Sequence, residues 1–184
     1  QNWDLPTIIA NCEKTGIQGV EARTQHAHGI EPSISAAARA EVKKRFADSP
    51  IEFGGPGTNQ CYDSPDPAKV KEMIEGTKAF IKLSHDCGGT GVKVKPNDLH
   101  KEVDQEITIA QIAKSLNEVG KFAGDYGQKI RVEVHGSCSP LPIMKKIIDQ
   151  VEDPNVGLCW NCNGEDLGGD GFQKNFDLVK DRFA

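Results

Sequence analysis

The chain has 184 residues, of which 37% are hydrophobic and 27% are charged, so one folded domain over residues 1–184 is expected rather than a disordered chain. Its 22 basic and 27 acidic residues give a net charge of −5, which argues against a nucleic-acid-binding surface because such surfaces carry a basic excess. No apolar run approaches the roughly 20 residues that a membrane span needs.

The first half of the chain alternates between helical and strand-like apolar spacing. The pattern predicts a helix over 5–15, a strand over 17–23, a helix over 33–46, a strand over 51–54, a Gly/Pro/Asn-rich loop through 64, and a third helix ended by Gly88 and Gly89. Gly16 is expected to end the first helix, and Ser33 to begin the second. Asp66 and Pro67 suit the N-cap and first turn of the third helix.

The same alternation continues through the second half. It predicts a strand over 91–95, a loop over 96–100, a helix over 107–126, a strand over 130–135, a helix from 140 through 151, a strand over 156–160, a Gly-rich loop over 164–171 and a last helix over 172–183. Strands that alternate with helices indicate βαβ units and therefore a parallel sheet. Five strands use the whole chain, whereas a TIM-type barrel has eight in about 250 residues. Two interpretations remain: part of such a barrel, or a complete five-stranded open sheet.

Six cysteines are scattered along the chain, which is too long to need disulfide staples. Cys159 and Cys162 form a CxxC motif, but a zinc ribbon needs a second such pair and there is none. A thioredoxin-like site would place the motif at a helix start, whereas this one closes an apolar, strand-like run. The thiols are therefore expected to be free and mostly structural.

Polar residues two positions apart end several predicted strands, and such pairs share one face of a strand. These pairs are Glu21 with Arg23, Lys93 with Lys95, Glu133 with His135, and Asn161 with Asn163. In parallel α/β folds the carboxyl ends of the strands build the active site. Charges placed there need a partner, a ligand or a metal, since burial alone is costly. Structural ion pairs or solvated side chains are the alternative interpretation.

A second candidate group is the His26-Ala27-His28 sequence in the loop after the first strand. Two histidines so spaced can bind a metal, although an exposed pair is often incidental. The Gly-rich segment 164–171 matches neither a Walker nor a GxGxxG pattern, so it predicts a flexible loop rather than a phosphate site.

Four segments, taken together, resemble the sugar phosphate isomerase/epimerase group, the xylose isomerase-like TIM barrels. They are TGIQGVEARTQHAHGIEP, SPDPAKVKEMIEGTKAFIKLSHDCGGTGVKVKPN, IRVEVHG and NVGLCWNCN. The resemblance implies an α/β fold of the (β/α) barrel type that is incomplete, with about five of eight βα units present. The chain would correspond to strands two to six and lack the first strand and the last two.

The resemblance also implies one divalent metal, Mn²⁺, Mg²⁺, Co²⁺ or Zn²⁺, with four ligands from the ends of strands five to eight. Glu133 matches the first ligand, a glutamate, whereas Asn161 stands where an aspartate is expected. The last two ligands would lie beyond Ala184. A neutral amide is a weaker ligand for a hard cation than a carboxylate, so a shifted set that includes His135 is a second expectation.

The activity so implied is proton abstraction next to the carbonyl of a sugar or sugar phosphate, through an enediolate. Glu133 would be the catalytic base. Glu133 and His135 would both be metal ligands. The expected substrate-binding residues are Glu21, Arg23, His26, His28, Lys93, Lys95, Asn97, His135, Asn161 and Asn163.

Three other functions compete with this one. A carbohydrate-binding barrel without catalysis is favoured by Asn161, a DNA-repair endonuclease on a related barrel is disfavoured by the net charge of −5, and a flavodoxin-like domain lacks its phosphate loop. The expected partner is a small sugar, with no nucleic acid and no membrane. A cytoplasmic location is expected from the absence of a signal sequence, and a homo-oligomer is left open.

Overall fold

The computed structural model describes residues 2–161 and 163–184. In this part of the chain, five parallel strands form one sheet in the order β1-β2-β3-β4-β5. The strands are β1 (Gly19–Arg23), β2 (Glu52–Cys61), β3 (Gly91–Lys95), β4 (Lys129–Glu133) and β5 (Val156–Cys159). Because each strand pairs with the next one in sequence, every crossover runs in the same direction around the sheet, as in part of a barrel.

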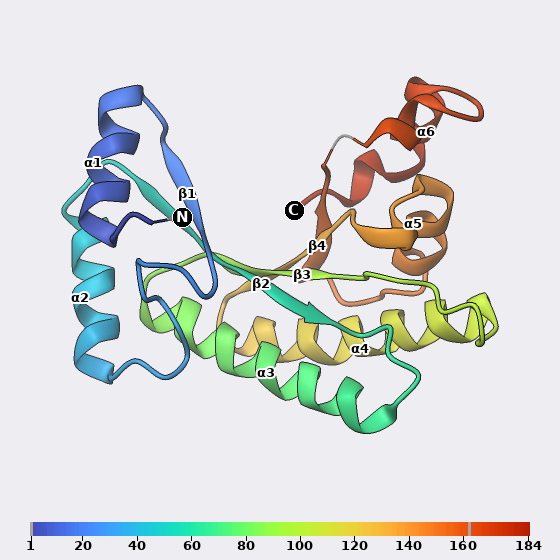
Figure 1. Cartoon of the computed structure of the whole chain (residues 1–184), viewed down its shortest axis with the longest axis horizontal. Coiled ribbons are helices and arrows are strands. Elements are labelled where there is room, and N and C mark those ends of the chain that lie inside the picture. The colour runs from blue at the N-terminus through green and yellow to red at the C-terminus, as the bar shows by residue number, and fades with distance from the viewer. Residues whose placement is uncertain (1, 162) are drawn as a thin grey trace.

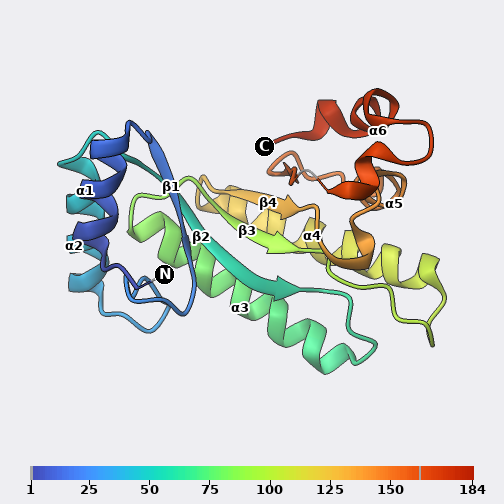
Figure 2. The same ribbon diagram turned by 45° about the horizontal axis from the view of Figure 1, so that its top comes forward.

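Helices connect the strands and cover one face of the twisted sheet. They are α1 (Leu5–Thr15), α2 (Ala36–Ala47), α3 (Pro67–Asp86), α4 (Gln105–Asp125), α5 (Leu141–Ile148) and α6 (Phe172–Val179). The two longest helices, α3 and α4, lie side by side against the middle strands (Figure 1). Figure 2 shows the same arrangement from a second direction, with α1 and α2 at one end and α5 and α6 at the other.

Alternation along the strands divides the side chains into an apolar and a polar set. Val92, Val94, Ile130 and Val132 are fully buried and belong to the core beneath the helices. The alternate positions of the same strands carry charged side chains, and we call the side of the sheet that carries them the inner face. This pattern places the predicted site residues of these strands on one surface, away from the helices.

The helix ends confirm most of the start and stop residues that the sequence predicts. The Asp66 carboxylate accepts a hydrogen bond from the Ala68 N–H at 2.9 Å, and Pro67 follows in the first turn. Gly16 adopts a φ of 75° after α1, a left-handed conformation that glycine adopts without strain. The expected start of the second helix is wrong: α2 begins at Ala36, capped by Ser35 rather than Ser33.

The largest difference from expectation concerns β2. A strand over 51–54 followed by a loop was predicted, but the strand continues to Cys61. Its small residues misled the prediction, because glycine and proline usually weaken a strand. Gly55, at a φ of 111°, lies so close to β3 that an added Cβ would overlap the Gly91 carbonyl oxygen. Here the glycine is required by the close approach of two strands.

Several element ends also differ. The predicted strands over 130–135 and 156–160 end earlier, at Glu133 and Cys159, and the helix predicted over 172–183 ends at Val179. A 3₁₀ turn over Lys180–Arg182 follows, after which the Ala184 N–H donates to the Leu158 carbonyl at 3.1 Å. The loop predicted over 164–171 contains a 3₁₀ turn, Gly164–Leu167. Within the described residues, no helix is long and apolar enough to cross a membrane.

Candidate active site at the carboxyl edge of the sheet

A cleft of about 140 Å³ opens on the inner face, where β1 to β4 end. It is lined by Glu21, Arg23, Gly57, Thr58, Asn59, Lys93, Lys95, Glu133 and His135. Six of these are predicted site residues. They form three pairs separated by two positions, which lie in β1, in β3 and at the end of β4. Parallel strands thus bring polar residues far apart in sequence to one edge of the sheet.

Lys93 lies at the centre of the cleft's charged groups. Its Nζ is 2.8 Å from Glu21 Oε1 and 3.3 Å from Glu133 Oε2. The Lys93 side chain is 18% exposed and that of Glu133 only 11%. One ammonium therefore bridges two carboxylates from different strands in a partly desolvated setting, where the electrostatic attraction is stronger than at an open surface.

Glu133 is held at both carboxylate oxygens. Besides the contact with Lys93, its Oε1 accepts a 2.6 Å hydrogen bond from the side-chain amide of Asn161. Burial alone would raise the pKa of Glu133, but the Lys93 charge and the Asn161 hydrogen bond outweigh it, so the pKa lies below its ordinary value of 4.5. The carboxylate is therefore ionised at neutral pH.

The opposing shift occurs at Lys93. Burial would lower the pKa of its ammonium, but the hydrogen bond and charge of Glu21 and the charge of Glu133 raise it above the ordinary value of 10.5. Both partners of the ion pair thus favour the charged state. We refer to Glu21, Lys93 and Glu133 as the charged triad.

The backbone of β2 makes room for this triad. A Cβ added at Gly57 would overlap the carboxylate of Glu21, so only glycine leaves Glu21 within reach of Lys93. The hydroxyl of Thr58 donates to the Lys93 carbonyl at 2.7 Å, and the Lys95 ammonium donates to the Asn59 side chain at 3.1 Å. Sequence reasoning missed these three β2 residues. Their only signal was the run of small residues, which also marks close approach between strands.

His135 follows β4 and also lines the cleft. Its Nδ1 is buried and has no hydrogen-bond partner among the described residues. A buried polar nitrogen normally has a partner, so this unpaired atom is an unusual feature of a residue that lines the cleft.

The two predicted loop histidines are not among the residues that line the cleft. The ring of His28 is used by the backbone, since its Nε2 lies 2.7 Å from the Arg23 carbonyl and its Nδ1 accepts from the Ile30 N–H at 3.1 Å. His28 therefore shapes the loop after β1. His26 packs edge-on against it, with ring centroids 6.3 Å apart. A substrate-binding role for either residue stays a prediction.

Asn97 and Asn163 also lie outside the cleft lining and have local structural contacts. Asn97 has a φ of 70°, and its carbonyl accepts from the Cys138 N–H at 3.2 Å, which ties two loops together. The Asn163 amide donates to the Asn161 carbonyl at 2.9 Å. Asn163 thus helps to fix the backbone at Asn161, whose side chain reaches Glu133.

The described residues do not fit the expected metal site. Among them, no group of three or more His, Cys, Asp or Glu side chains converges as a set of metal ligands. Glu133 and His135 are the predicted ligands, but one oxygen of Glu133 is paired with Lys93 and the other accepts from the amide of Asn161. A divalent ion would have to displace both contacts. Metal binding by Glu133 and His135 stays a prediction.

Five cysteines in the described part of the chain are free, as expected. Burial is the main cause of raised thiol pKa values, to about 12 for Cys61 and Cys138 and about 11 for Cys87. These thiols are protonated at neutral pH and therefore poor nucleophiles. The predicted CxxC motif includes Cys162, which lies outside the described residues.

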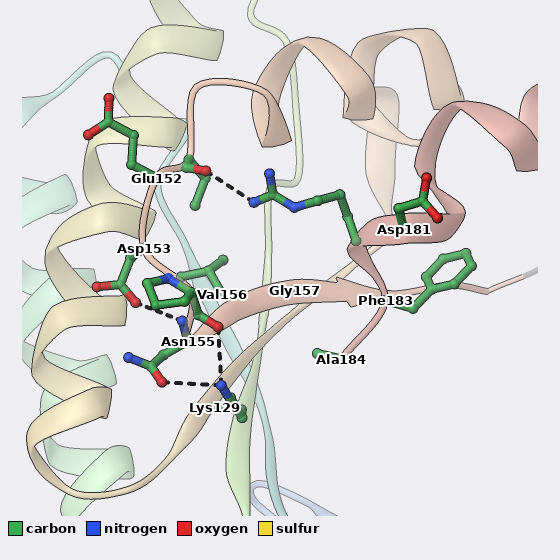
Figure 3. A pocket seen from close by; sticks show the side chains of 12 residues that line it. Lys129, Glu152, Asp153, Asn155, Val156, Gly157, Asp181, Phe183 and Ala184 are labelled. Atoms are coloured by element: carbon green, nitrogen blue, oxygen red, sulfur yellow. Dashed lines mark hydrogen bonds between the residues drawn. The ribbon is translucent and has the colours of Figure 1, made fainter.

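A larger cavity of about 420 Å³ lies at the opposite edge of the sheet, where β4 and β5 begin (Figure 3). There the Lys129 ammonium donates to the Pro154 carbonyl at 3.1 Å and to the Asn155 side chain at 3.2 Å. The Arg182 guanidinium donates to the Val151 carbonyl at 3.0 Å. Both cations bind loop oxygens of the chain itself. These contacts connect neighbouring loops, so we interpret this cavity as structural despite its larger volume.

Comparison with known proteins agrees with the barrel geometry. The family model for the xylose isomerase-like TIM barrel matches residues 9–176. The chain belongs to this family. No curated protein matches it by sequence. The match confirms the fold expected from the four sequence segments and sets aside the open-sheet alternative.

Solved structures with the same fold include several sugar epimerases. D-psicose 3-epimerase from Clostridium cellulolyticum H10, crystallised with D-tagatose, superposes with a TM-score of 0.82 at 18% identity, over 100% of this chain and 66% of that one. An L-ribulose 3-epimerase gives 0.79 at 16% identity, over 98% and 62%. The zinc-bound IolI protein gives 0.71 at 22% identity, over 85% and 57%.

At these identities the likeness shows a shared fold. The chain spans between 57% and 66% of the length of these three structures, so their activities concern longer proteins. The five strands correspond to a partial barrel, which confirms the expectation of an incomplete set of βα units.

Proposed function

We propose that this chain carries the proton-transfer site of a sugar isomerase or epimerase, with Glu133 as the base. The observation that supports the proposal most is the state of Glu133. It is an ionised, largely buried carboxylate at the carboxyl edge of a parallel sheet, fixed by Lys93 and Asn161 and followed by the unpartnered Nδ1 of His135. Active sites of barrels of this kind lie at that edge.

In this proposal, Glu133 removes a proton from the carbon next to a sugar carbonyl. The electrons of the broken C–H bond form a C=C bond, and the carbonyl electrons move to the oxygen, giving an enediolate. Return of the proton to the former carbonyl carbon isomerises the sugar, while the hydroxyl proton of the deprotonated carbon moves to the former carbonyl oxygen. Return of a proton to the opposite face of the same carbon epimerises it and needs a second acid on that face. A general base in position contributes about 10²- to 10⁴-fold to such a reaction.

The composition of the cleft favours a polyhydroxylated substrate. Arg23 and Lys95 supply donors, while Asn59 supplies both a donor and an acceptor. Two cationic side chains at one cleft would also hold a phosphate or carboxylate on the sugar. A sugar phosphate is therefore the finer form of this proposal, and competition by inorganic phosphate for sugar binding tests it.

The test is exchange of the sugar's carbon-bound hydrogen with deuterated water, followed by NMR on a panel of ketoses and their phosphates. Glu133→Gln keeps the size of the side chain and removes the base, so exchange is expected to fall about 10³-fold. Glu152→Gln, at an exposed glutamate beside the opposite cavity, is the matched control and should keep the wild-type rate. Exchange by Glu133→Gln at the wild-type rate would overturn the assignment.

A second candidate function is sugar binding without catalysis. It is favoured by Asn161, a neutral residue at the position where the family resemblance places an acidic ligand. Saturable sugar binding by calorimetry, combined with no deuterium exchange for any sugar that binds, would favour this function over catalysis.

A further inference from the structure

We propose that the ammonium of Lys93 is the built-in cation of this cleft, occupying the place at Glu133 that a divalent metal would otherwise take, and that it stabilises the charge that develops on the substrate oxygen. The stabilising role of Lys93 toward the substrate oxygen rests on the proposed function. The claim that Lys93 occupies the place of a metal concerns the unliganded protein and is tested independently.

The first argument is convergence of charge. Two carboxylates from different strands point at one position, and Lys93 Nζ occupies it, 2.8 Å from Glu21 and 3.3 Å from Glu133. Two acidic groups so near one point would attract a cation in any case, because their mutual repulsion in a partly buried cleft is unfavourable. The chain supplies that cation from β3, covalently attached.

The second argument is the role of Asn161. Its amide donates to the remaining oxygen of Glu133 at 2.6 Å. An aspartate at this position could not donate and would add a third negative charge beside Glu133, which only a further cation could balance. The asparagine and the lysine therefore act together: between them they satisfy both oxygens of Glu133 without any ion from solution.

The third argument is the donor count of the ammonium. A lysine has three N–H donors, and Glu21 and Glu133 are the two ion-pair partners of Lys93 among the described residues. The third donor is left for an oxygen in the cleft that Lys93 lines. A hydrogen bond from an ammonium to a developing oxyanion is strong in a partly desolvated site.

The proton-abstraction step balances with these groups alone. Glu133 takes the proton, the C–H electron pair becomes the C=C bond, and the C=O electron pair moves to the oxygen that Lys93 contacts. Lys93 stays protonated throughout, and Glu133 returns the proton either to the same carbon or to the former carbonyl carbon. In the second case the hydroxyl proton of the deprotonated carbon moves to the former carbonyl oxygen, which Lys93 contacts, so that a new carbonyl forms. Glu21 does not touch the reacting atoms in this scheme, so it is a positioning residue for Lys93.

The experiment measures Mn²⁺ binding by electron paramagnetic resonance in the wild type and in three variants. Lys93→Met removes the charge at similar length, Lys93→Arg keeps it, and Asn161→Asp restores an acidic side chain at an exposed position. We expect no saturable Mn²⁺ site at Glu133 in the wild type or in Lys93→Arg. Lys93→Met and Asn161→Asp should each gain saturable Mn²⁺ binding that is at least about tenfold tighter than any residual binding by the wild type, and adding Glu133→Gln to either should abolish the gain.

Saturable Mn²⁺ binding by the wild type that is lost in Glu133→Gln would overturn the proposal, since the site would then be a metal site despite Lys93. Unchanged binding in both Lys93→Met and Asn161→Asp would also overturn it, because neither residue would then stand in for a metal. Folding of each variant is checked by circular dichroism, and Asn161→Asp keeps the test valid if Lys93→Met does not fold.

Failure of the proposed function gives a different result. A protein that exchanges no sugar proton can still show the Mn²⁺ pattern above, which would leave Lys93 as a structural counter-ion and refute only its role toward substrate. A protein whose exchange is abolished by EDTA and restored by Mn²⁺ would keep the proposed function and refute the inference about Lys93.

Discussion

The two edges of the same sheet use their cations in opposite ways. At the amino edge, where β4 and β5 begin, Lys129 and Arg182 donate to neutral loop oxygens and hold together the segments around a cavity of about 420 Å³. At the carboxyl edge, Lys93 sits between two carboxylates in a cleft of about 140 Å³. The smaller space holds the convergent charged groups, so charge arrangement rather than volume marks it as the candidate site.

The difference has a simple origin in strand geometry. Side chains that leave the carboxyl ends of parallel strands converge on the inner face, so Glu21, Lys93 and Glu133 meet although they are far apart in sequence. At the amino edge the chain arrives from helices through loops whose carbonyls need donors. The following predictions test this contrast, starting with the largest effect.

Removing the proposed base should give the largest difference in sugar proton-exchange rate between variants at the two edges. Glu133→Gln is expected to lower sugar proton exchange about 10³-fold, whereas Lys129→Met at the opposite cavity should leave the rate within about twofold. Both variants are compared by NMR exchange rates at one substrate concentration below saturation. Equal losses in the two variants would mean that the carboxyl edge is not the reacting site.

Filling the space beside Glu21 should disturb the triad without touching the base. Gly57→Ala places a methyl group where the Glu21 carboxylate lies. We expect the exchange rate to fall about tenfold and the free energy of unfolding to drop by about 1–3 kcal/mol, the usual cost of overpacking. Gly164→Ala, where an added Cβ meets no atom within 4 Å, is the control and should be neutral in both assays.

Lowering the pH should reduce the contribution of Glu133 to the free energy of unfolding. The pKa of Glu133 in the folded protein lies below 4.5, so its contribution to stability is present above the unfolded-state pKa and is lost as the pH falls through the folded value. Wild type is thus expected to exceed Glu133→Gln by about 1 kcal/mol in unfolding free energy at pH 7 and by nearly nothing below the folded pKa. Urea unfolding at several pH values measures this. A gap that persists in acid would argue against an ionised Glu133.

The smallest effect is expected at the amino edge. Lys129→Met removes two hydrogen bonds from an exposed lysine to loop oxygens, and such contacts contribute about 0.5–1 kcal/mol at most. Thermal unfolding of this variant should therefore shift by only a few degrees. A larger loss would show that Lys129 is a main determinant of the β4–β5 joint.

The sequence predicted the fold and six of the nine residues that line the carboxyl-edge cleft, for physical reasons that can be stated residue by residue. Alternation on β3 and β4 puts Val92 and Val132 under the helices, so Lys93 and Glu133 must face the other way. The same reasoning missed Gly57, because a strand without apolar alternation resembles a loop until its neighbour is known.

Contacts across the sheet could not be read from local pattern. Nothing in the sequence around Lys93 says that its partners are Glu21 and Glu133 rather than solvent, since the pairing depends on the register of three strands. Likewise, the role of His28 in its own loop follows from backbone groups of Arg23 and Ile30. Such contacts depend on turn geometry, which residue type alone does not specify.

The most direct test of the account is an NMR titration of the Glu133 side-chain carboxyl, with and without saturating Mg²⁺. If Lys93 is its built-in counter-ion, the carboxyl should titrate below 4.5, the value should rise in Lys93→Met, and Mg²⁺ should leave the wild-type curve unchanged. A wild-type carboxyl that titrates at or above 4.5, or one whose titration moves to lower pH when Mg²⁺ is added, would contradict the account.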